Sequence, residues 1–397
     1  MKIFVSSLID LKKSSHNSRL HQFLKYLLEK RHQITVLSIN DWWKASWDNK
    51  SDDYRDDFNY LFDNMEYFYL TNKKISPVLQ DTLSIIESNR IRDILKKDDY
   101  DIHFSYNCLC CGYVVAKYLK SKNVNTIYDI ADNLPGMART SPQIPIFLRP
   151  LGGLMSEIVM KKNIQSAKRI TYTTKSLIDS YKISAKKLEL IPNGVDTKVF
   201  KKYPSIKLKT KLGLDNSFVI GHVGVLREWL DFGPLFKAFK SLTDSFNLKL
   251  LIVGDGVGYN DVMRLAKKYR IFEDVVFAGT VPYSLVPDYI SCMDVGIIPF
   301  KRDQVSQDSQ PLKLFEYMAC ETPVIATNVK GIIESVGDLV LYASDSEDYR
   351  EKITVLYNDE GLRRKMGLMG RKFVEENYDW SRISSNLENV LRDTDDI

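Results

Sequence analysis

The sequence predicts two α/β domains in tandem, each a doubly wound parallel sheet with helices on both faces. Short β-branched or aromatic segments alternate with longer amphipathic segments from one end of the chain to the other. The alternation stops at a lysine-rich, proline-containing stretch, Lys198–Lys211, which reads as a linker, and it starts again near Phe218. A chain of 397 residues is also too long for one ordinary hydrophobic core and suits two.

The first predicted domain covers residues 1–197. Two of its segments, Arg19–Arg31 and Val78–Lys97, carry apolar residues at the 3.6-residue spacing of a helix. Its strand candidates are short runs rich in β-branched and aromatic residues: Lys2–Leu8, Ile34–Ile39, Tyr67–Leu70, Ile102–Tyr106, Thr126–Ile130, Arg169–Thr173 and Leu188–Ile191.

The second predicted domain covers residues 198–378 and repeats the pattern. Its crossover helices include Leu235–Phe246, Asp261–Tyr269 and Leu312–Cys320. Its strands are expected at Phe218–Val223, Lys249–Val253, Val275–Ala278, Val295–Pro299, Val324–Thr327 and Leu339–Tyr342. A last amphipathic pattern begins at Asp379. Parallel open sheets bind ligands at the carboxyl ends of their strands, so the cleft between two such domains is the default site.

The composition excludes several classes of protein. With 44% apolar and 27% charged residues, the chain is not disordered, collagen-like or a disulfide scaffold. No apolar run approaches the roughly 20 residues of a membrane-spanning helix. The first residues, MKIFVSSLIDLKK, become charged too early for the apolar part of a signal peptide. Five cysteines in so long a chain favour free thiols in a reducing compartment, so we expect a soluble, cytoplasmic protein.

The formal net charge of +5 is unevenly distributed. Residues 139–187 hold ten Lys and Arg and only two carboxylates, Glu157 and Asp179. The same segment contains the apolar runs Ile144–Leu148 and Leu151–Met155. This mixture fits peripheral contact with an anionic membrane, or equally a core helix with a solvated basic face. Nucleic acid is not expected, because no recognised nucleic-acid-binding module accompanies the basic segment.

The stretch Asp308–Cys320 carries the most informative chemistry. Pro311 suits the first position of a helix, where its missing N–H is not needed, and a helix N-terminus aimed at a cleft attracts phosphate. Lys313 and Glu316 lie three residues apart and therefore share one face of this helix. The lysine can meet a diphosphate, and the glutamate can accept hydrogen bonds from two ribose hydroxyls. The alternative is an ordinary surface salt bridge.

The C-terminal half contains a series of short motifs that follow one another in a characteristic order. They are Ile191-Pro-Asn-Gly-Val-Asp196 with Phe200, Val253-Gly-Asp-Gly256, Phe277-Ala-Gly279, Val281-Pro282, Asp294-Val295 with Pro299, Glu316-Tyr-Met-Ala319, Thr322-Pro-Val-Ile-Ala-Thr327, Gly331-Ile-Ile-Glu334 and Tyr378-Asp-Trp380. This series resembles family 4 glycosyltransferases, whose GT-B fold has two Rossmann-like domains facing a cleft. The resemblance implies transfer of a sugar from a nucleotide sugar bound mainly by the second domain. It also implies that the closing helix, residues 379–397, crosses back onto the first domain.

The sequence departs from the family's pattern at two places. The family's pair of glutamates eight residues apart has Asp308 in its first position and Glu316 in its second. The Arg and Lys that the family carries after its first C-domain strand fall at Val225 and Leu230, and neither of these is basic. The sequence therefore looks like a divergent branch with the motif Pro-x-Lys-x-x-Glu-Tyr.

The resemblance implies a set of residues around the nucleotide sugar. The phosphate-binding cation would be Lys313 or, second, Arg227. A glycine-containing turn after a strand, Gly254 to Gly258, would line the same site, although its spacing alone could also suggest a dinucleotide fingerprint. The other expected donor-binding residues are Asp308, Ser309, Gln310, Pro311, Leu312, Glu316, Gly254 and Gly256.

Candidate residues in the first domain are less conventional. The loop after the first predicted strand has none of the glycines that the family often carries there. Ser18, Arg19 and His21 open the first helix instead and resemble the start of the divergent branch. Arg19 could hold a phosphate, and His21 is either functional or a core or capping residue. Asp129 and Asp132 follow a predicted strand, where they either cap a helix or supply the base for the acceptor hydroxyl.

We therefore expect a glycosyltransferase that needs no metal or other cofactor besides its nucleotide sugar substrate. Family 4 implies retention of anomeric configuration, whereas a true base at Asp132 or Asp129 would allow inversion. Cys108, Cys110 and Cys111 lack a second group at zinc-like spacing and are expected to be buried thiols. The expected acceptor is a glycan or polyprenyl-linked precursor at the inner face of the cell membrane. A sugar-nucleotide epimerase and a catalytically degenerate sugar-binding protein are the alternatives.

Overall fold

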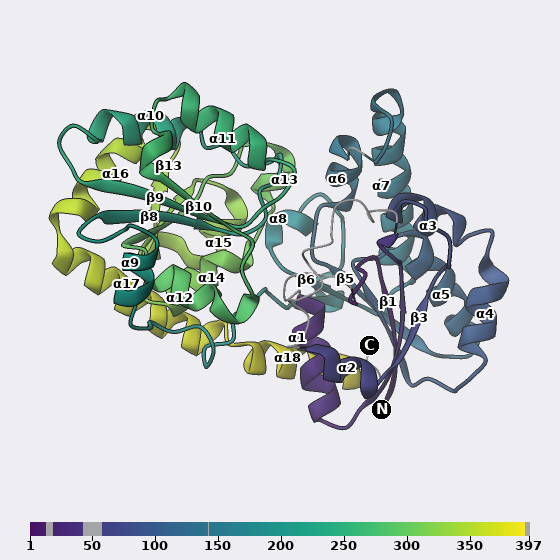
Figure 1. The fold of residues 1–397 in the computed structure, drawn as a ribbon. Coiled ribbons are helices and arrows are strands. Elements are labelled where there is room, and N and C mark those ends of the chain that lie inside the picture. Colours follow the sequence, from purple (N-terminus) through teal and green to yellow (C-terminus); the bar gives the residue numbers. More distant parts are fainter. Residues whose placement is uncertain (13–18, 43–57, 142, 394–397) are drawn as a thin grey trace. The chain divides into compact units, whose positions relative to one another are not determined.

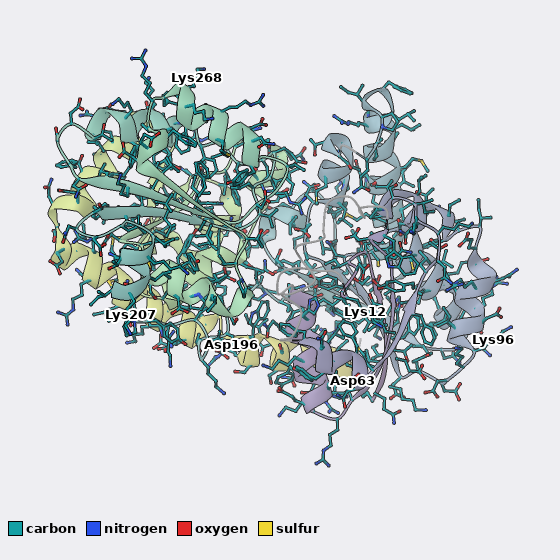
Figure 2. All side chains as sticks on the ribbon, viewed as in Figure 1. Lys12, Asp63, Lys96, Asp196, Lys207 and Lys268 are labelled. Atoms are coloured by element: carbon teal, nitrogen blue, oxygen red, sulfur yellow. The ribbon has the colours of Figure 1, made fainter. Side chains whose placement is uncertain are left out.

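The described residues form two compact units. The computed structural model describes residues 1–12, 19–42, 58–141 and 143–393. Unit 1 comprises residues 1–192 and 381–397, and unit 2 comprises residues 193–380. Figure 1 shows the helices and strands, and Figure 2 shows the side chains that fill the layers between each sheet and its helices.

Within the described residues, the sheet of unit 1 has seven parallel strands in the order β3-β2-β1-β4-β5-β6-β7. They are β1 (Lys2–Ser7), β2 (Gln33–Ser38), β3 (Glu66–Tyr69), β4 (Ile102–Tyr106), β5 (Asn125–Ile130), β6 (Arg169–Tyr172) and β7 (Leu188–Leu190). The chain winds away from β1 in one direction and from β4 in the other. The strand order therefore reverses between β1 and β4.

Helices connect the strands of unit 1 and cover its sheet (Figure 1). They are α1 (Arg19–Glu29), α2 (Asn59–Asp63), α3 (Pro77–Leu83), α4 (Ser88–Leu95), α5 (Cys110–Lys120), α6 (Leu134–Thr140), α7 (Arg149–Ser166), α8 (Lys175–Ile178) and α18 (Trp380–Arg392), with the 3₁₀ turns η4 (Ile146–Leu148) and η5 (Ala185–Lys187). α18 buries Ile383, Leu387 and Leu391 along one face. Its Glu388 accepts a hydrogen bond from Nε2 of His32 (2.9 Å), which fixes the closing helix on this unit.

The sheet of unit 2 has six parallel strands in the order β10-β9-β8-β11-β12-β13. They are β8 (Phe218–Val223), β9 (Leu248–Val253), β10 (Val275–Gly279), β11 (Val295–Ile298), β12 (Val324–Thr327) and β13 (Leu341–Ala343). Here the strand order reverses between β8 and β11, which is where an open parallel sheet binds its ligand.

Both faces of the unit 2 sheet are buried by helices. Phe218 and Ile220 of β8 pack in one core with α10, α11 and α16, and Val219 and Val223 pack in the other with α14 and α15. This burial on both faces explains why β8 is apolar except for His222. The helices are α9 (Ile206–Lys211), α10 (Gly233–Leu242), α11 (Tyr259–Lys268), α12 (Val286–Ser291), α13 (Gln304–Gln307), α14 (Leu312–Ala319), α15 (Lys330–Val336), α16 (Ser346–Asn358) and α17 (Glu360–Asn377), with 3₁₀ turns η6 (Phe272–Asp274), η7 (Tyr283–Leu285) and η8 (Gly337–Leu339).

All thirteen predicted strands are present, with each end no more than two residues from the one expected. The single helical segment predicted at Val78–Lys97 is wrong, because the chain forms α3 and α4 there. Asp81 of α3 is buried and accepts hydrogen bonds from the N–H groups of Cys110 (3.0 Å) and Cys111 (2.9 Å). This attachment to the start of α5 holds α3 in place, and the chain turns before α4.

The predicted linker Lys198–Lys211 is also wrong. The stretch lies inside unit 2, and its last six residues form α9. Phe200 is completely buried in the core of this unit. Arg371 of α17 donates a hydrogen bond to the carbonyl of Thr197 (2.8 Å), which fixes the preceding backbone. Lysine-rich composition at this position reflects a solvated surface rather than a flexible connection.

Candidate functional site

The candidate site of unit 2 is built from the loops that follow β8, β9 and β10 and from the start of α14. Backbone hydrogen bonds join the three loops: the N–H of Gly224 donates to Val253 (2.9 Å), and the N–H of Gly254 donates to Gly279 (2.7 Å). The loops lie beside the reversal of strand order between β8 and β11. Their position is the usual ligand site of such a sheet.

Gly254 and Gly256 allow two of these loops to touch. Their φ angles are +126° and +150°, a region that other residues avoid. A Cβ atom on Gly254 would lie 2.2 Å from the carbonyl oxygen of Gly224, and one on Gly256 would lie 2.4 Å from that of Leu226. Both glycines predicted at the donor site are therefore required for the backbone contact that shapes this edge.

Lys313 extends from the first turn of α14 towards the end of β8. Its Nζ lies 3.2 Å from Nε2 of His222, and a Cβ on Gly224 would come within 2.7 Å of the same nitrogen. Burial lowers the pKa of Lys313 to about 8, although the neighbouring charge of Glu316 opposes this effect. The lysine is thus a half-buried cation supported by a neutral ring.

His222 is a neighbour of the site that the sequence did not identify. It lies on β8 with 2% of its surface exposed, and its Nδ1 is 3.0 Å from the carbonyl oxygen of Ile297. Because a carbonyl oxygen only accepts, we assign the proton to Nδ1, and the lone pair of Nε2 then faces Lys313. Burial and the Lys313 charge hold the pKa of His222 well below its usual range. A histidine inside an otherwise apolar strand was the available signal.

Glu316 lies one helical turn after Lys313 and is 7% exposed. The hydroxyl of Tyr283 donates a hydrogen bond to its Oε1 (2.9 Å). Burial raises the pKa of Glu316 to about 7, with the Tyr283 hydrogen bond and the Lys313 charge acting in the opposite direction. The alternative of a surface salt bridge is wrong, because the carboxylate is buried and its side-chain partner is Tyr283, while Lys313 contacts His222.

Gln310 and Pro311 set the start of α14. Pro311 precedes the helix with a ψ of 135°, so it is not the first helical residue as predicted. Gln310 is buried, and its Nε2 donates to the hydroxyl of Ser335 (2.7 Å). Its side-chain and backbone oxygens accept hydrogen bonds from Asn193 (2.5 and 2.6 Å). These bonds anchor Gln310 before the extended Pro311, and its predicted contact with the donor stays a prediction.

Asp308, Ser309 and Leu312 are half-buried residues of the same segment. Asp308 follows α13, and Leu312 opens α14. The hydroxyl of Ser309 donates to the carbonyl of Val305 (3.0 Å). The carbonyl of Ser309 packs so closely on α15 that a Cβ on Gly331 would lie 2.4 Å from it. The segment is therefore fixed between α13, α14 and α15.

Arg227, the second candidate cation, belongs to the loop after β8. It is half-buried, and its guanidinium lies 5.7 Å from the centre of the Trp229 ring. A cation that stacks on an aromatic face at such a position contributes modestly to loop order. Lys313, by contrast, contacts the buried histidine, which makes it the stronger of the two candidates.

In unit 1, Arg19 and Asp129 form a buried ion pair with each other. Their side chains are 3% and 0% exposed. The guanidinium of Arg19 also donates to the carbonyl of Ile191, and the hydroxyl of Thr171 donates to the second carboxylate oxygen. The predicted roles of phosphate-binding cation and acceptor base are corrected accordingly. The pair joins α1, β5, β6 and the end of β7, and neither charge is accessible.

His21 and Asp132 have different surroundings. Nε2 of His21 is 3.0 Å from the carbonyl oxygen of Leu11, and its ring packs on Phe58, so the core alternative is the correct one. Asp132 is exposed just beyond β5 and accepts a hydrogen bond from Nδ2 of Asn107 (2.8 Å). Asp132 is therefore the accessible carboxylate of the predicted pair. Ser18 lies outside the described residues.

Metal and membrane features were sought in the described parts of the chain. No three His, Cys, Asp or Glu side chains come together there as metal ligands would. No helix in those parts is both long and apolar enough to cross a bilayer. Cys108, Cys110 and Cys111 are buried free thiols, which confirms the prediction for them.

The two parallel-sheet, Rossmann-like units are those of the GT-B fold, and the predicted fold class is confirmed. A solved structure of Anabaena Alr3699/HepE in complex with UDP matches 99% of this chain and 100% of its own, with a TM-score of 0.74 and 16% sequence identity. Residues 205–373 match the family described as glycosyl transferases group 1. This match lies within the part of the chain whose motifs resemble those of glycosyltransferases, and the divergent branch with its motif stays a prediction.

Two curated relatives extend the comparison. N-acetyl-alpha-D-glucosaminyl L-malate synthase of Bacillus anthracis is 22% identical over 348 residues, which are 84% of this chain and 86% of the relative. A GDP-mannose-dependent monoacylated alpha-(1-6)-phosphatidylinositol monomannoside mannosyltransferase of Corynebacterium glutamicum is 30% identical over 214 residues, which are 51% and 56% of the two chains. The chain spans about half the length of this second relative and of others that it matches.

The Arg19–Asp129 pair is expected to stabilise unit 1. Arg19→Met or Asp129→Asn alone should lower the free energy of unfolding by about 3–5 kcal/mol, because each leaves a buried charge without its partner. The double variant Arg19→Met/Asp129→Leu should recover most of this loss. Urea denaturation measures the free energy of unfolding of each variant. A well-folded Arg19→Met variant that binds inorganic phosphate more weakly would restore the phosphate-binding role.

Glu316→Gln is expected to stabilise the protein at high pH. The folded carboxyl has a raised pKa of about 7, so folding favours the protonated form and stability falls as the pH rises from about 4.5 to 7. Glutamine avoids this penalty, which we expect to be about 1–3 kcal/mol at pH 8 and close to zero near pH 4. Thermal unfolding at both pH values measures the difference, and an equal effect at both would contradict the burial argument.

Proposed function

We propose that the protein is a glycosyltransferase that moves a sugar from a nucleoside diphosphate sugar to a hydroxyl group. The observation that carries the proposal is the pairing of a supported cation, Lys313, with a buried carboxylate, Glu316, on one turn of α14. Both lie where the strand order of unit 2 reverses. The match of residues 205–373 to glycosyl transferases group 1 covers this helix and supports the same chemistry.

Lys313 and the start of α14 would bind the diphosphate. The ammonium group and the N–H groups of the first helical turn supply positive charge to an anion. Negative charge grows on the diphosphate as the sugar bond breaks, so these groups stabilise the transition state more than the bound donor. On this basis we propose that no divalent metal is needed, because Lys313 and the helix supply its electrostatic role.

Glu316 would bind the ribose. An ionised carboxylate can accept hydrogen bonds from two neighbouring hydroxyls, and Tyr283 holds one of its oxygens in place. With a pKa of about 7, this carboxyl becomes fully ionised only in neutral to alkaline solution. The apparent affinity for the donor should therefore increase as the pH rises through 7. Asp308, Ser309, Leu312 and Arg227 would lie around the remaining parts of the donor.

The anomeric configuration of the product depends on what Asp132 does during transfer. We propose a hexosyltransferase that retains anomeric configuration, in keeping with the resemblance to family 4. Asp132 would then orient the acceptor hydroxyl by a hydrogen bond. If Asp132 instead removes the hydroxyl proton during attack, the product is inverted. An NMR measurement of the product anomer, with and without Asp132→Asn, distinguishes these two roles.

The acceptor is proposed to be a lipid-linked or cell-surface glycan precursor, such as a polyprenyl-linked sugar, used at the inner face of the membrane. By their names, one relative transfers mannose to a phosphatidylinositol mannoside, and another functions in capsular polysaccharide biosynthesis. The relatives do not favour the epimerase alternative. Incubation with several nucleotide sugars tests the whole proposal, because transfer releases nucleoside diphosphate only when a lipid extract supplies the acceptor. Donor binding without turnover would instead support a degenerate sugar-binding protein.

Lys313→Ala is expected to lower kcat by about 10²–10³-fold, because it removes charge stabilisation from the departing diphosphate. Nucleoside diphosphate release measures the effect. Lys240→Ala on α10 removes an exposed lysine of the same unit and should leave kcat unchanged. A larger loss for Arg227→Ala than for Lys313→Ala would show that Arg227 is the phosphate-binding cation.

His222 is expected to position Lys313 without touching the substrate. His222→Leu should raise KM for the donor by about tenfold, because a hydrogen bond to a charged group is lost. His222→Gln keeps an acceptor near Nζ and should recover most of the donor affinity. Steady-state kinetics of both variants measure the difference. Equal losses for leucine and glutamine would indicate a role in packing alone.

A further inference from the structure

A dense group of exposed apolar side chains lies on unit 1, on elements that hold none of the site residues described above. It consists of Ile146–Leu148 in η4 and of Leu151, Leu154, Met155 and Ile158 on α7. Ile146 and Phe147 are 75% and 78% exposed. Single exposed apolar residues are common on soluble proteins, but a contiguous apolar patch marks an interaction surface.

The exposed residues of α7 occupy one face of the helix. Leu151, Met155 and Ile158 follow one another at intervals of three or four residues, while Gly153 and Met160 on another face are buried in unit 1. α7 is therefore apolar on both its buried and its exposed sides. This finding contradicts the alternative of a core helix whose outer face is simply basic and solvated.

Basic side chains lie next to the exposed apolar face of α7. Lys161 and Lys162 are exposed and stand one turn beyond Ile158, and Arg149 lies at the start of the helix. Glu157 is the only carboxylate in the sequence between Asp132 and Asp179. It already accepts hydrogen bonds from Arg139 (3.2 Å) and Lys161 (2.9 Å), so the surface keeps an excess of positive charge.

Two other basic residues of the segment have partners within unit 1. Arg169 forms ion pairs with Glu189 (2.8 Å) and Asp393 (3.0 Å). Lys187 donates a hydrogen bond to the carbonyl of Ala167 (3.0 Å). Among the described residues of 139–187, the large exposed apolar side chains all lie in η4 and α7, which narrows the candidate membrane segment to these two elements.

We propose that η4 and the exposed face of α7, here called the α7 surface, bind a bilayer that contains anionic phospholipids. Met155 and Lys162 are about 10 Å apart along the helix axis. This separation lets the apolar side chains insert below the headgroups while the flexible lysine side chains meet the anionic groups above them. Figure 1 shows α6 and α7 extending together beyond the sheet of unit 1, which presents the end of this pair to a surface.

This proposal goes beyond the proposed function and extends it, because a membrane-bound unit 1 would bring a lipid-linked acceptor to the enzyme. The two can fail separately. Vesicle binding requires neither a nucleotide sugar nor an acceptor, and nucleoside diphosphate release from a soluble acceptor requires no vesicle.

Co-sedimentation of the full chain with vesicles tests the α7 surface. Wild-type protein should bind vesicles containing phosphatidylglycerol, bind pure phosphatidylcholine vesicles much more weakly, and dissociate as salt is added. Ile146→Ser/Phe147→Ser should weaken binding to phosphatidylglycerol vesicles at least tenfold. Lys161→Gln/Lys162→Gln should weaken it by roughly tenfold and reduce its salt dependence. All four residues are exposed, so circular dichroism should show native folding.

A matched control lies on α9 of unit 2, where Ile206 is 78% exposed beside Lys207 and Lys211. Ile206→Ser/Lys207→Gln/Lys211→Gln should leave vesicle binding unchanged. Absence of wild-type binding at low salt, or an equal loss in this control, would overturn the proposal. A third outcome would also overturn it: the wild type is oligomeric, and Ile146→Ser/Phe147→Ser makes it monomeric without changing vesicle binding. The α7 surface would then join two copies of the chain.

Discussion

The site in unit 2 depends on holding a lysine and a glutamate, largely withdrawn from water, on one turn of α14. Withdrawal disfavours both charges, which is why the pKa of Lys313 falls to about 8 and that of Glu316 rises to about 7. The groups that contact them are neutral: a histidine ring for the lysine and a tyrosine hydroxyl for the glutamate. An anionic diphosphate and a ribose would supply the partners that folding does not, so ligand binding relieves an unfavourable burial.

The strands could be predicted because both faces of each sheet are covered. Such strands are continuous apolar runs between polar segments, as β8 and β12 illustrate. The shared face of Lys313 and Glu316 also follows from local helix geometry. Contacts between distant residues left no such pattern. Arg19 meets Asp129 across 110 positions, and His222 meets Lys313 across 91, so their roles became visible only in the folded chain.

Helix α7 shows a different limit of sequence reasoning. Its residues are apolar on two faces, so periodicity alone does not tell which face the protein buries. The answer depends on small and close contacts: Gly153 is packed so tightly that a Cβ would lie 2.3 Å from the Arg139 side chain. That contact directs Leu151, Leu154 and Met155 outwards. The break between α3 and α4 has a similar origin, since Asp81 is held by the start of α5 rather than by any helix-ending residue nearby.

The buried charged side chains of the two units differ in how much hydrogen-bonding capacity they leave for a ligand. Asp129 accepts hydrogen bonds at both carboxylate oxygens, and Arg19 binds both a carboxylate and a carbonyl, although its buried Nε has no partner among the described residues. Within the described residues, Glu316 has one side-chain donor and Lys313 has one neutral acceptor. Burial at the end of a strand therefore does not by itself mark a functional residue. Unused hydrogen-bonding capacity at an accessible position does, and by that criterion the exposed Asp132 in the loop after β5, not the buried Asp129, is the carboxylate able to meet an acceptor.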